Sequence, residues 1–491
     1  MDRRLILAGT VAAVLAAAPA AHAAVRTWLG ATGTSWNVAS NWAENAVPVN
    51  GDTLVFPDNP TSRTTNNDLV GLSVAGVTVT TTNSGADFDF TGNGITLTGP
   101  ITFSNPGVGT GSGDPNWAIP ITLGASITMT SDGRVTPINA AIGLGANTLT
   151  VAGGGDLWFN GIVSGTGGIT KNSSSAFQLF GANTYSGATL VNSGTIFARH
   201  ATALGSSATG TTFANGTGLG VHSGPYVLSE PLTFQGPGNT IGAYSNVELA
   251  GAISFAGTLT YNAYGPGTIS GAVTSSGTLV KGQADTLSTS GAWPAFTGQV
   301  NVVAGGFAPT GSFPAAVNLQ APASLYGYGT TGLLTITGGT FAPGVALFQY
   351  FRPAGLASSG GQHNLTLAPG TAGTDYDQIQ VTGPVSLGGT TLVATSVGTL
   401  PFGSTYTIVD NDGADAVAGT YAGLPEGTQF TMFLNTFRIT YVGGTGNDVV
   451  LTAVDPAAVP TTPATPVPGP GVLALALGAL ALLAAVRRRS G

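Results

Sequence analysis

Two stretches of the sequence, about 110 residues apart, repeat the same order of short apolar runs and glycines. The first covers Gly167–Ile196 and the second begins at Gly277, and the chain's only two lysines fall at the same place in each. Repetition of this kind indicates a fold in which each unit packs against its neighbours rather than around one central core. The aligned pairs are Lys171 with Lys281, Gly181 with Gly291, Gly187 with Gly298, and Gly194 with Gly305.

Short runs of β-branched and aromatic residues, interrupted by glycine, proline or asparagine, recur through the body of the chain. Glycine contributes 76 of the 491 residues and charged residues only 7%, so helix formers such as lysine and glutamate are scarce. The body shows no helical periodicity, and its pattern predicts strands and tight turns. Examples of these runs are Val77–Thr82, Ile101–Phe103, Ile121–Met129, Leu149–Val151 and Thr391–Thr395.

These features predict an all-β fold, a right-handed parallel β-helix (β-solenoid). In such a rod, stacked coils bury a narrow ladder of apolar side chains, and glycine allows the chain to turn tightly at each corner. At roughly 25 residues per coil and about 4.8 Å per rung, residues 24–455 would form about 17 coils and a rod of about 80 Å. A pair of β-sandwich domains is the alternative that regular turn spacing also allows.

The charge balance excludes nucleic acid as a partner. The formal net charge is −8, and five arginines and one aspartate stand at the extreme termini, which leaves 8 basic residues against 20 acids in the body. Binding of nucleic acid requires clustered lysine and arginine, and the body has no such cluster. The absence of cysteine also removes disulfides, thiolate metal sites and cysteine nucleophiles.

The N-terminus has the pattern of an export signal. A basic start is followed by the apolar run Leu5–Ala20, and Ala21 and Ala23 are the small residues that signal peptidase accepts before its cleavage point. We expect residues 1–23 to be removed as a signal peptide. The alternative is an uncleaved N-terminal anchor, which the short, alanine-rich run and the cleavage pattern disfavour.

The C-terminus has the pattern of a stop-transfer segment. A Pro/Thr-rich linker precedes Gly471–Val486, sixteen residues without a charge, and Arg487, Arg488 and Arg489 follow at once. Together with the end of the linker this segment can span a bilayer, and the positive-inside rule keeps the arginines cytoplasmic. The expected organisation is a signal peptide 1–23, a β-helix repeat region 24–350, a closing β region 351–455, a linker 456–470, a transmembrane helix 471–486 and a basic tail 487–491.

Parts of the chain resemble known families. The motifs GGITK, GANTYSG and VNSGTI within residues 167–196 resemble the autotransporter-associated β-strand repeat, which implies a β-helix exposed at the cell surface. The set Trp28, Trp36, Trp42, Pro48, Asp52 and Phe56 is similar to the opening of many such repeat proteins.

The tail resembles the PEP-CTERM sorting signal of Gram-negative bacteria. Val467, Pro468, Gly469 and Pro470 precede the apolar segment and the terminal arginines, although the family's motif has glutamate where Gly469 stands. The resemblance implies an exosortase-like sorting enzyme as a partner. It also implies anchoring in the inner membrane during transit, followed by release to the cell surface or beyond. A simple membrane anchor is the alternative.

Few residues offer recognisable chemistry. Beyond the signal peptide the histidines are His200, His222 and His363, which are isolated in the sequence, and no HExxH, GxSxG or P-loop pattern appears. We interpret Lys171 and Lys281 as solvated charges at turns, with a recurring ligand contact as the alternative. No catalytic residue, metal site or cofactor is expected.

Two acidic segments partly match calcium-binding patterns. Asp410–Asp415 lacks the distal glutamate of an EF-hand loop and fits a polar turn. Gly443–Leu451 fits the nonapeptide G-G-x-G-x-D-x-U-x, but that motif shares ions between consecutive copies and occurs here once. We therefore expect two turns rather than calcium sites.

The sequence as a whole favours an exported structural or adhesive repeat protein of the cell envelope or extracellular matrix. Exopolysaccharide and other surface glycans are candidate partners. The alternative is a carbohydrate-active enzyme, a polysaccharide lyase or hydrolase, because β-helices host such activities. Several aromatic side chains could either stack on sugar rings or fill the core: Trp117, Trp158, Trp293, Tyr326 and Tyr328.

Overall fold

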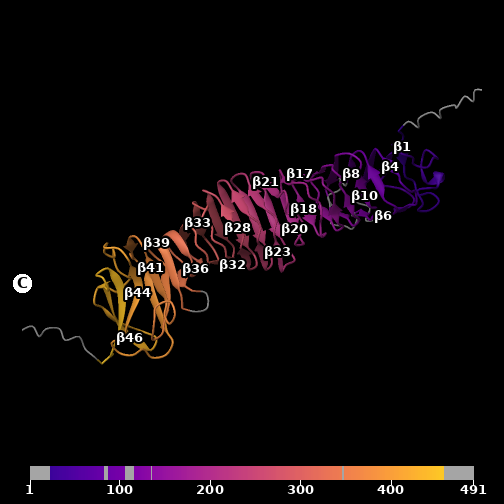
Figure 1. Ribbon diagram of the computed structural model, residues 1–491. Coiled ribbons are helices and arrows are strands. Elements are labelled where there is room, and N and C mark those ends of the chain that lie inside the picture. Colours follow the sequence, from indigo (N-terminus) through magenta and orange to yellow (C-terminus); the bar gives the residue numbers. More distant parts are fainter. Residues whose placement is uncertain (1–22, 82–86, 105–114, 134, 345–347, 458–491) are drawn as a thin grey trace, which may run out of the picture.

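The computed structural model describes residues 23–81, 87–104, 115–133, 135–344 and 348–457. They form 47 strands and one 3-10 helix, η1 (Ala39–Asn41), and wind into an elongated rod with β1 near one end and β46 at the other (Figure 1). The fold is a right-handed β-solenoid of about 14 turns with almost no helix. This confirms the predicted solenoid, and the alternative of two β-sandwich domains is wrong.

The solenoid has three faces, each built from parallel strands that successive coils contribute. Face 1 is a 12-stranded sheet that covers the N-terminal part of the rod. Its strands are β1 (Val25–Thr27), β2 (Thr53–Phe56), β5 (Gly76–Thr80), β8 (Ile101–Ser104), β11 (Ile127–Asp132), β14 (Leu149–Ala152), β17 (Ile169–Lys171), β19 (Thr189–Val191), β21 (Thr211–Phe213), β24 (Leu232–Phe234), β27 (Ile253–Phe255) and β30 (Val273–Thr274).

Face 2 runs along nearly the whole rod, and its strands pair in parallel from one coil to the next. They are β3 (Thr64–Asn67), β6 (Asp89–Gly92), β9 (Asn116–Trp117), β12 (Thr136–Ile138), β15 (Leu157–Phe159), β18 (Ala176–Leu179), β20 (Thr195–Ala198), β22 (Gly218–Val221), β25 (Asn239–Ala243), β28 (Thr258–Ala263), β31 (Thr278–Gly282), β33 (Gln299–Val302), β35 (Ala316–Leu319), β37 (Thr330–Ile336), β39 (Tyr350–Ser358) and β42 (Val385–Ser386).

Face 3 is built in two parts, a five-stranded sheet and then a nine-stranded sheet. The first comprises β4 (Ser73–Val74), β7 (Ile95–Leu97), β10 (Ile121–Leu123), β13 (Ile142–Gly143) and β16 (Val163–Ser164). The second comprises β23 (Tyr226–Leu228), β26 (Val247–Leu249), β29 (Gly267–Ile269), β32 (Thr286–Thr289), β34 (Gly306–Pro309), β36 (Ser324–Gly327), β38 (Thr340–Pro343), β40 (Gln362–Leu367) and β43 (Thr391–Ser396).

The C-terminal end closes with antiparallel strands. Here β41 (Gln378–Val381) and β44 (Thr405–Asn411) extend the parallel pairing, whereas β45 (Gln429–Met432), β46 (Asn435–Gly443) and β47 (Asp448–Val454) pair antiparallel. These last strands add no coil to the solenoid. The predicted count of about 17 coils was therefore too high.

Along each strand, side chains that point into the core alternate with side chains that point to the surface. In β28, Leu259, Tyr261 and Ala263 point inward and are buried, while the residues between them are only partly covered. Successive rungs place like residues on top of one another, so Phe213 pairs with Phe234 and their rings stack at 4.6 Å. Each short strand therefore contributes a few apolar side chains to a continuous core.

An aromatic cluster closes the N-terminal end. Trp28, Trp36, Trp42 and Phe56 are fully buried there, and Trp28 meets Trp42 edge to face at a centroid distance of 5.2 Å. Rings of this size cover the first coil, which has no preceding coil to pack against.

The predicted targeting segments fall mostly outside the described residues. Ala21 and the rest of residues 1–22 lie outside them, as do Val467, Pro468, Gly469, Pro470, the segment 471–486 and Arg487, Arg488 and Arg489. Ala23 is described and exposed, immediately before β1. Across the described part of the chain, no helix has the length and hydropathy needed to cross a membrane.

Corner glycines allow consecutive coils to stack in contact. A Cβ at Gly167 would overlap the carbonyl oxygen of Asn147 in the coil below, whereas a Cβ at Gly154 would meet no atom within 4 Å. We predict that Gly167→Ala lowers the free energy of unfolding by about 1–3 kcal/mol, because backbone must shift to accommodate the methyl group. Gly154→Ala, the matched control, should change it little. Urea unfolding followed by tryptophan fluorescence would measure both, and equal effects would contradict this account of the corners.

Candidate functional site

The two lysines are buried in the core, so their interpretation as solvated turn charges is wrong. Lys171 ends β17 with an exposed fraction of 0%, and it stands in the inward column between Val151 and Val191. Its ammonium group donates hydrogen bonds to the carbonyl oxygens of Ser173, at 2.6 Å, and Ser193, at 2.7 Å. The side chain thus joins the corners of two consecutive coils.

Lys281 has the same arrangement on face 2 that Lys171 has on face 1. It lies on β31 of face 2, is also fully buried, and donates to the carbonyl oxygens of Gln283 and Ala304 at 3.0 and 2.9 Å. Those acceptors are the aligned counterparts of the ones Lys171 uses. The sequence repeat is therefore a structural unit of strand, lysine corner and strand.

The GANTYSG motif is also an interlock between coils. Asn183 is buried, accepts a hydrogen bond from the Val163 N–H at 2.8 Å and donates to the Ala203 carbonyl at 2.6 Å. Tyr185 is buried as well, and its hydroxyl pairs with that of Thr189 at 2.7 Å. Asn183 and Tyr185, which carry part of the family resemblance, thus stabilise the fold.

The outer surface of face 2 carries a stack of rings, which we call the aromatic ladder: Phe197, His222, Tyr244 and Tyr264. His222 and Tyr244 stack at a centroid distance of 3.8 Å, and Tyr244 and Tyr264 at 4.6 Å. The backbone N–H of each stacked residue bonds to the coil before it, so successive rungs set the ring spacing. Tyr244 and Tyr264 are 41% and 46% exposed. The ladder therefore presents ring edges and phenol hydroxyls to solvent.

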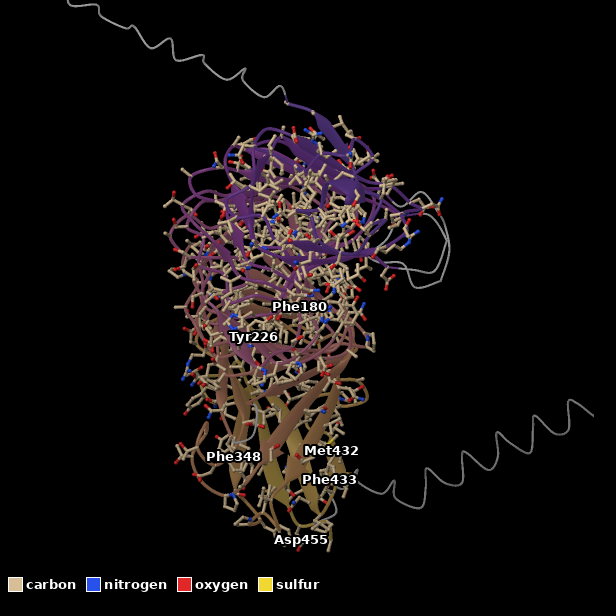
Figure 2. The ribbon with its side chains drawn as sticks, turned by 90° about the vertical axis from the view of Figure 1, so that its right-hand side faces the viewer. Phe180, Tyr226, Phe348, Met432, Phe433 and Asp455 are labelled. Carbon is tan, nitrogen blue, oxygen red and sulfur yellow. The ribbon has the colours of Figure 1, made fainter. Side chains whose placement is uncertain are left out.

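Arg199 and Phe180 extend the ladder toward the N-terminal end. The Arg199 guanidinium lies 5.2 Å from the Phe180 ring centroid and donates two hydrogen bonds to the Gln178 carboxamide. Partial burial and the nearby Arg199 charge lower the pKa of His222 to about 4, so its imidazole is neutral at pH 7. Figure 2 labels Phe180 and Tyr226 midway along the rod, and the Tyr226 hydroxyl donates to the His222 carbonyl at 2.6 Å.

The aromatic residues named as candidates from the sequence differ in how far they are buried. Trp117 and Trp293 are fully buried and fill the core. Trp158 packs on Phe180 at 5.9 Å and is partly covered, and Tyr326 is partly covered on face 3. Tyr328 is 43% exposed but stacks on no ring of the described chain. The ladder itself was missed, because its members are of different residue types and lie about one coil apart.

Titratable groups elsewhere support folding. Burial lowers the pKa of His363 to about 3, and its ring is hydrogen-bonded to the Tyr421 hydroxyl at 3.0 Å. A hollow of about 300 Å³ beside face 3 is lined by one carboxyl side chain, Glu230, whose pKa burial raises to about 7. Hydrolysis of glycosides ordinarily uses two carboxyl groups, so this hollow lacks half of the required pair.

The two acidic segments with calcium-like patterns lie against each other. The Asp448 carboxylate accepts the Asn411 N–H at 2.9 Å, and Asn447 donates to the Gly413 carbonyl at 2.5 Å. Asp448 acts as a cap for the neighbouring turn. Among the residues that the structure describes, no three histidine or acidic side chains are grouped so as to hold a metal ion.

The fold and the ladder define the class as a right-handed β-solenoid with an exposed aromatic stripe, and comparisons with known proteins agree in part. No protein-family model matches the chain. The chain is 35% identical over 100 residues to the adhesin BmaC autotransporter of Brucella suis biovar 1 (strain 1330). That match covers 20% of this chain and 3% of the adhesin, so the chain spans a small part of its relative's length.

A solved structure also aligns with much of the rod. The crystal structure of the Haemophilus influenzae Hap adhesin covers 83% of this chain, and 62% of that chain is covered, at 10% identity. The TM-score of this alignment is 0.29. The chain thus combines a solenoid fold with a weak sequence similarity to an autotransporter adhesin.

The buried lysines should give the protein a distinctive pH dependence. Burial lowers the pKa of both Lys171 and Lys281 to about 8, below the value of about 10.4 in the unfolded chain. The unfolded state therefore binds more protons between these values, and the lysines' contribution to stability rises from about pH 8 to pH 10. Comparing wild type with a Lys171→Met/Lys281→Met variant by urea unfolding at each pH isolates this contribution.

At pH 7 the same variant should be less stable than wild type, because the carbonyl oxygens that accept hydrogen bonds from the two lysines lose their donors. A stability difference that stays constant from pH 7 to pH 10 would contradict the assigned burial of the ammonium groups.

Proposed function

We propose that this protein is an exported, non-enzymatic adhesive or structural rod of the cell surface, and that its aromatic ladder binds glycans. The observation that carries the proposal is the exposure of stacked rings on consecutive rungs of face 2. The partial similarity to an autotransporter adhesin supports a surface location.

The chemistry of the ladder suits a neutral or weakly charged polysaccharide. Its rings offer apolar surface, the tyrosine hydroxyls can donate and accept hydrogen bonds, and His222 is uncharged at neutral pH. The Arg199 guanidinium is already occupied by Gln178 and Phe180. A long polymer can contact several rungs at once, so weak contacts add through multivalency.

The second candidate function, a polysaccharide lyase or hydrolase, rests on fold analogy alone. The hollow beside face 3 holds a single carboxyl group, Glu230. Incubation of the purified protein with acidic and neutral polysaccharides, followed by assay for reducing or unsaturated sugar ends, tests this alternative directly.

The glycan proposal predicts a specific loss of binding. A Tyr244→Ala/Tyr264→Ala variant removes the two most exposed rings of the ladder and should reduce retention in polysaccharide-containing native gels at least tenfold. Each tyrosine hydroxyl can form a hydrogen bond with a net free energy of about 1 kcal/mol, so the loss of two hydroxyls and their ring edges exceeds the roughly 1.4 kcal/mol of a tenfold change. Affinity electrophoresis against a panel of exopolysaccharides supplies the measurement.

Tyr328→Ala is the matched control, because Tyr328 is equally exposed but lies outside the ladder. It should bind like wild type. Equal losses in both variants, or binding by neither wild type nor variant to any glycan in the panel, would count against the ladder as the binding site.

Exposed apolar side chains at the C-terminal end of the rod support the proposal that the tail anchors the protein in a membrane. Four exposed apolar residues surround the point where the chain leaves β47: Val397, Phe402, Phe433 and Leu434, with exposed fractions of 61–76%. Asn435 bonds the segment that carries Val397, and Gly403 donates to the carbonyl of Ala453. Figure 2 shows Phe433 and Asp455 at this same end. These side chains would meet a lipid surface if 471–486 crosses a membrane.

We further propose that Val467 to Pro470 is a sorting motif read by an exosortase-like enzyme, which removes the apolar segment after transit. Replacing Pro468 and Pro470 by alanine should leave membrane insertion intact, because hydropathy scarcely changes, and should block release. Mass spectrometry of membrane and extracellular fractions measures this. Persistence of an intact C-terminus through Gly491 in every wild-type fraction would show that the tail is a permanent anchor.

A further inference from the structure

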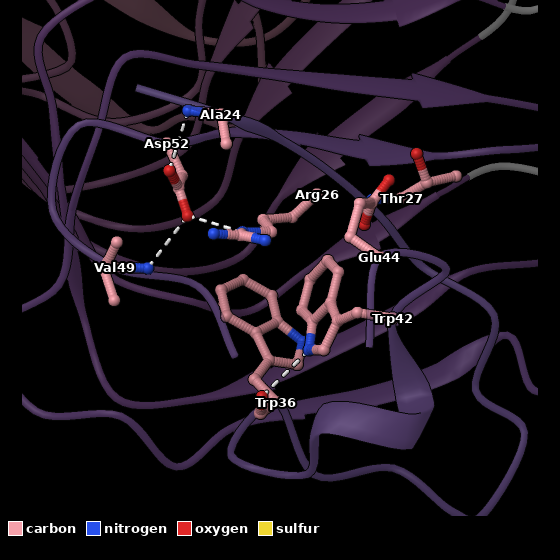
Figure 3. A network of polar contacts seen from close by, with 8 residues as sticks. All are labelled: Ala24, Arg26, Thr27, Trp36, Trp42, Glu44, Val49 and Asp52. Carbon is pink, nitrogen blue, oxygen red and sulfur yellow. Dashed lines mark hydrogen bonds and ion pairs between the residues drawn. The ribbon is translucent and has the colours of Figure 1, made fainter. Parts of the chain in front are cut away.

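The start of the described chain is fixed by a buried carboxylate. Asp52 has an exposed fraction of 0%, and one of its oxygens accepts the backbone N–H of Ala24 at 2.9 Å. The other oxygen accepts Arg26 Nε at 2.7 Å and the Val49 N–H at 3.1 Å (Figure 3). Burial alone would raise the pKa of Asp52, but these three hydrogen bonds and the Arg26 charge together outweigh it, so the pKa is lowered.

Ala24 is held on its other side as well. Its carbonyl oxygen accepts the Thr53 N–H at 2.8 Å, and β1 begins at the next residue, Val25, which pairs with Thr53. Ala23, one residue earlier, is exposed. Among the described residues, the hydrogen bonds of the first rung therefore begin at the nitrogen of Ala24, which is the atom that Asp52 contacts.

This position coincides with the cleavage point expected from the sequence. Ala21 and Ala23 are the small residues of the predicted signal-peptidase site, and cleavage would fall between Ala23 and Ala24. The two observations are independent, since one is a pattern in the leader and the other is a contact of the folded body.

We propose that cleavage after Ala23 creates an α-ammonium group on Ala24 that is bound by the Asp52 carboxylate, so that removal of the leader completes the first rung of the solenoid. Hydrolysis breaks the amide bond between the Ala23 carbonyl carbon and the Ala24 nitrogen. The hydroxyl of water passes to Ala23, which departs with the leader as a carboxylate, and the Ala24 nitrogen takes up protons to become an ammonium.

The change strengthens a contact that already exists. Before cleavage the Ala24 nitrogen is a neutral amide with one proton to donate to Asp52. After cleavage it carries a positive charge, and charge-assisted hydrogen bonds are shorter and stronger than neutral ones. Asp52 then lies between two cations, the new ammonium and Arg26.

The composition of the chain makes this ammonium easy to observe. Besides the α-amino group, the only amines of the chain are those of Lys171 and Lys281, and both lysines are fully buried. A small amine-reactive ester added to the folded, exported protein therefore reports on the α-amino group, and peptide mass mapping assigns the labelled position.

The test uses the full chain, exported from a Gram-negative host through its own leader. One variant inserts a serine between Ala23 and Ala24, which places the new ammonium one residue, at most about 3.6 Å, beyond the Ala24 nitrogen, while Ala24 keeps its amide contact with Asp52. A second variant is Asp52→Asn. The N-terminal mass of each mature protein is determined first, then the labelling rate of its α-amine at pH 7.

The expected wild-type protein begins at Ala24, and its α-amine reacts about tenfold more slowly than that of the insertion variant, which corresponds to an amine pKa about one unit higher. Asp52→Asn should restore fast labelling. If the Asp52→Asn variant does not fold, the labelling rates of wild type and the insertion variant are still sufficient to test the proposal. A mature N-terminus at any other residue, or equal labelling rates in these two proteins, would overturn the proposal.

Discussion

The structure depends on one constraint: each coil must turn several corners while its backbone packs directly on the coil below. Carbonyl groups at these corners point toward the rod's interior or the next coil, where water cannot reach them, and each needs a donor. The chain meets this need with Lys171 and Lys281 and with Asn183, each of which bonds the backbone of a neighbouring coil. Gly194 and Gly305, at positive φ of 67° and 63°, allow the corners beside the lysines to form.

This constraint explains which parts of the structure could be predicted from the sequence. The lysine, asparagine, tyrosine and glycine of the repeat occupy corners, and corners recur with the unit, so their spacing revealed the solenoid. The environment of Lys171 could not be predicted, because a charged residue next to glycine and serine is typical of a solvated turn. Only the three-dimensional stacking shows that its stem continues the column of Val151 and Val191 and that its ammonium faces carbonyl oxygens.

The aromatic ladder was beyond sequence reasoning for a different reason. Which outward residues become neighbours depends on the length of every coil, and coil length varies from 16 residues, as between Ser324 and Thr340, to 29, as between Gln362 and Thr391. His222, Tyr244 and Tyr264 share no motif, and a one-residue error in any coil would move a side chain to the opposite surface of the sheet. The repeat therefore encodes the scaffold, while the outward surface carries residues that the repeat does not specify.

The two ends of the rod are closed by different structural elements. A solenoid leaves the backbone of its first and last coils without a partner, which exposes edges and apolar core. At the N-terminal end Trp28, Trp36 and Trp42 cover the core, and Asp52 fixes the first strand through Ala24 and Arg26. At the C-terminal end the antiparallel strands β45–β47 replace the missing coil. With both ends closed and the interior filled, the long outer faces are the surface through which such a rod can meet other molecules, and on face 2 that surface bears the exposed rings.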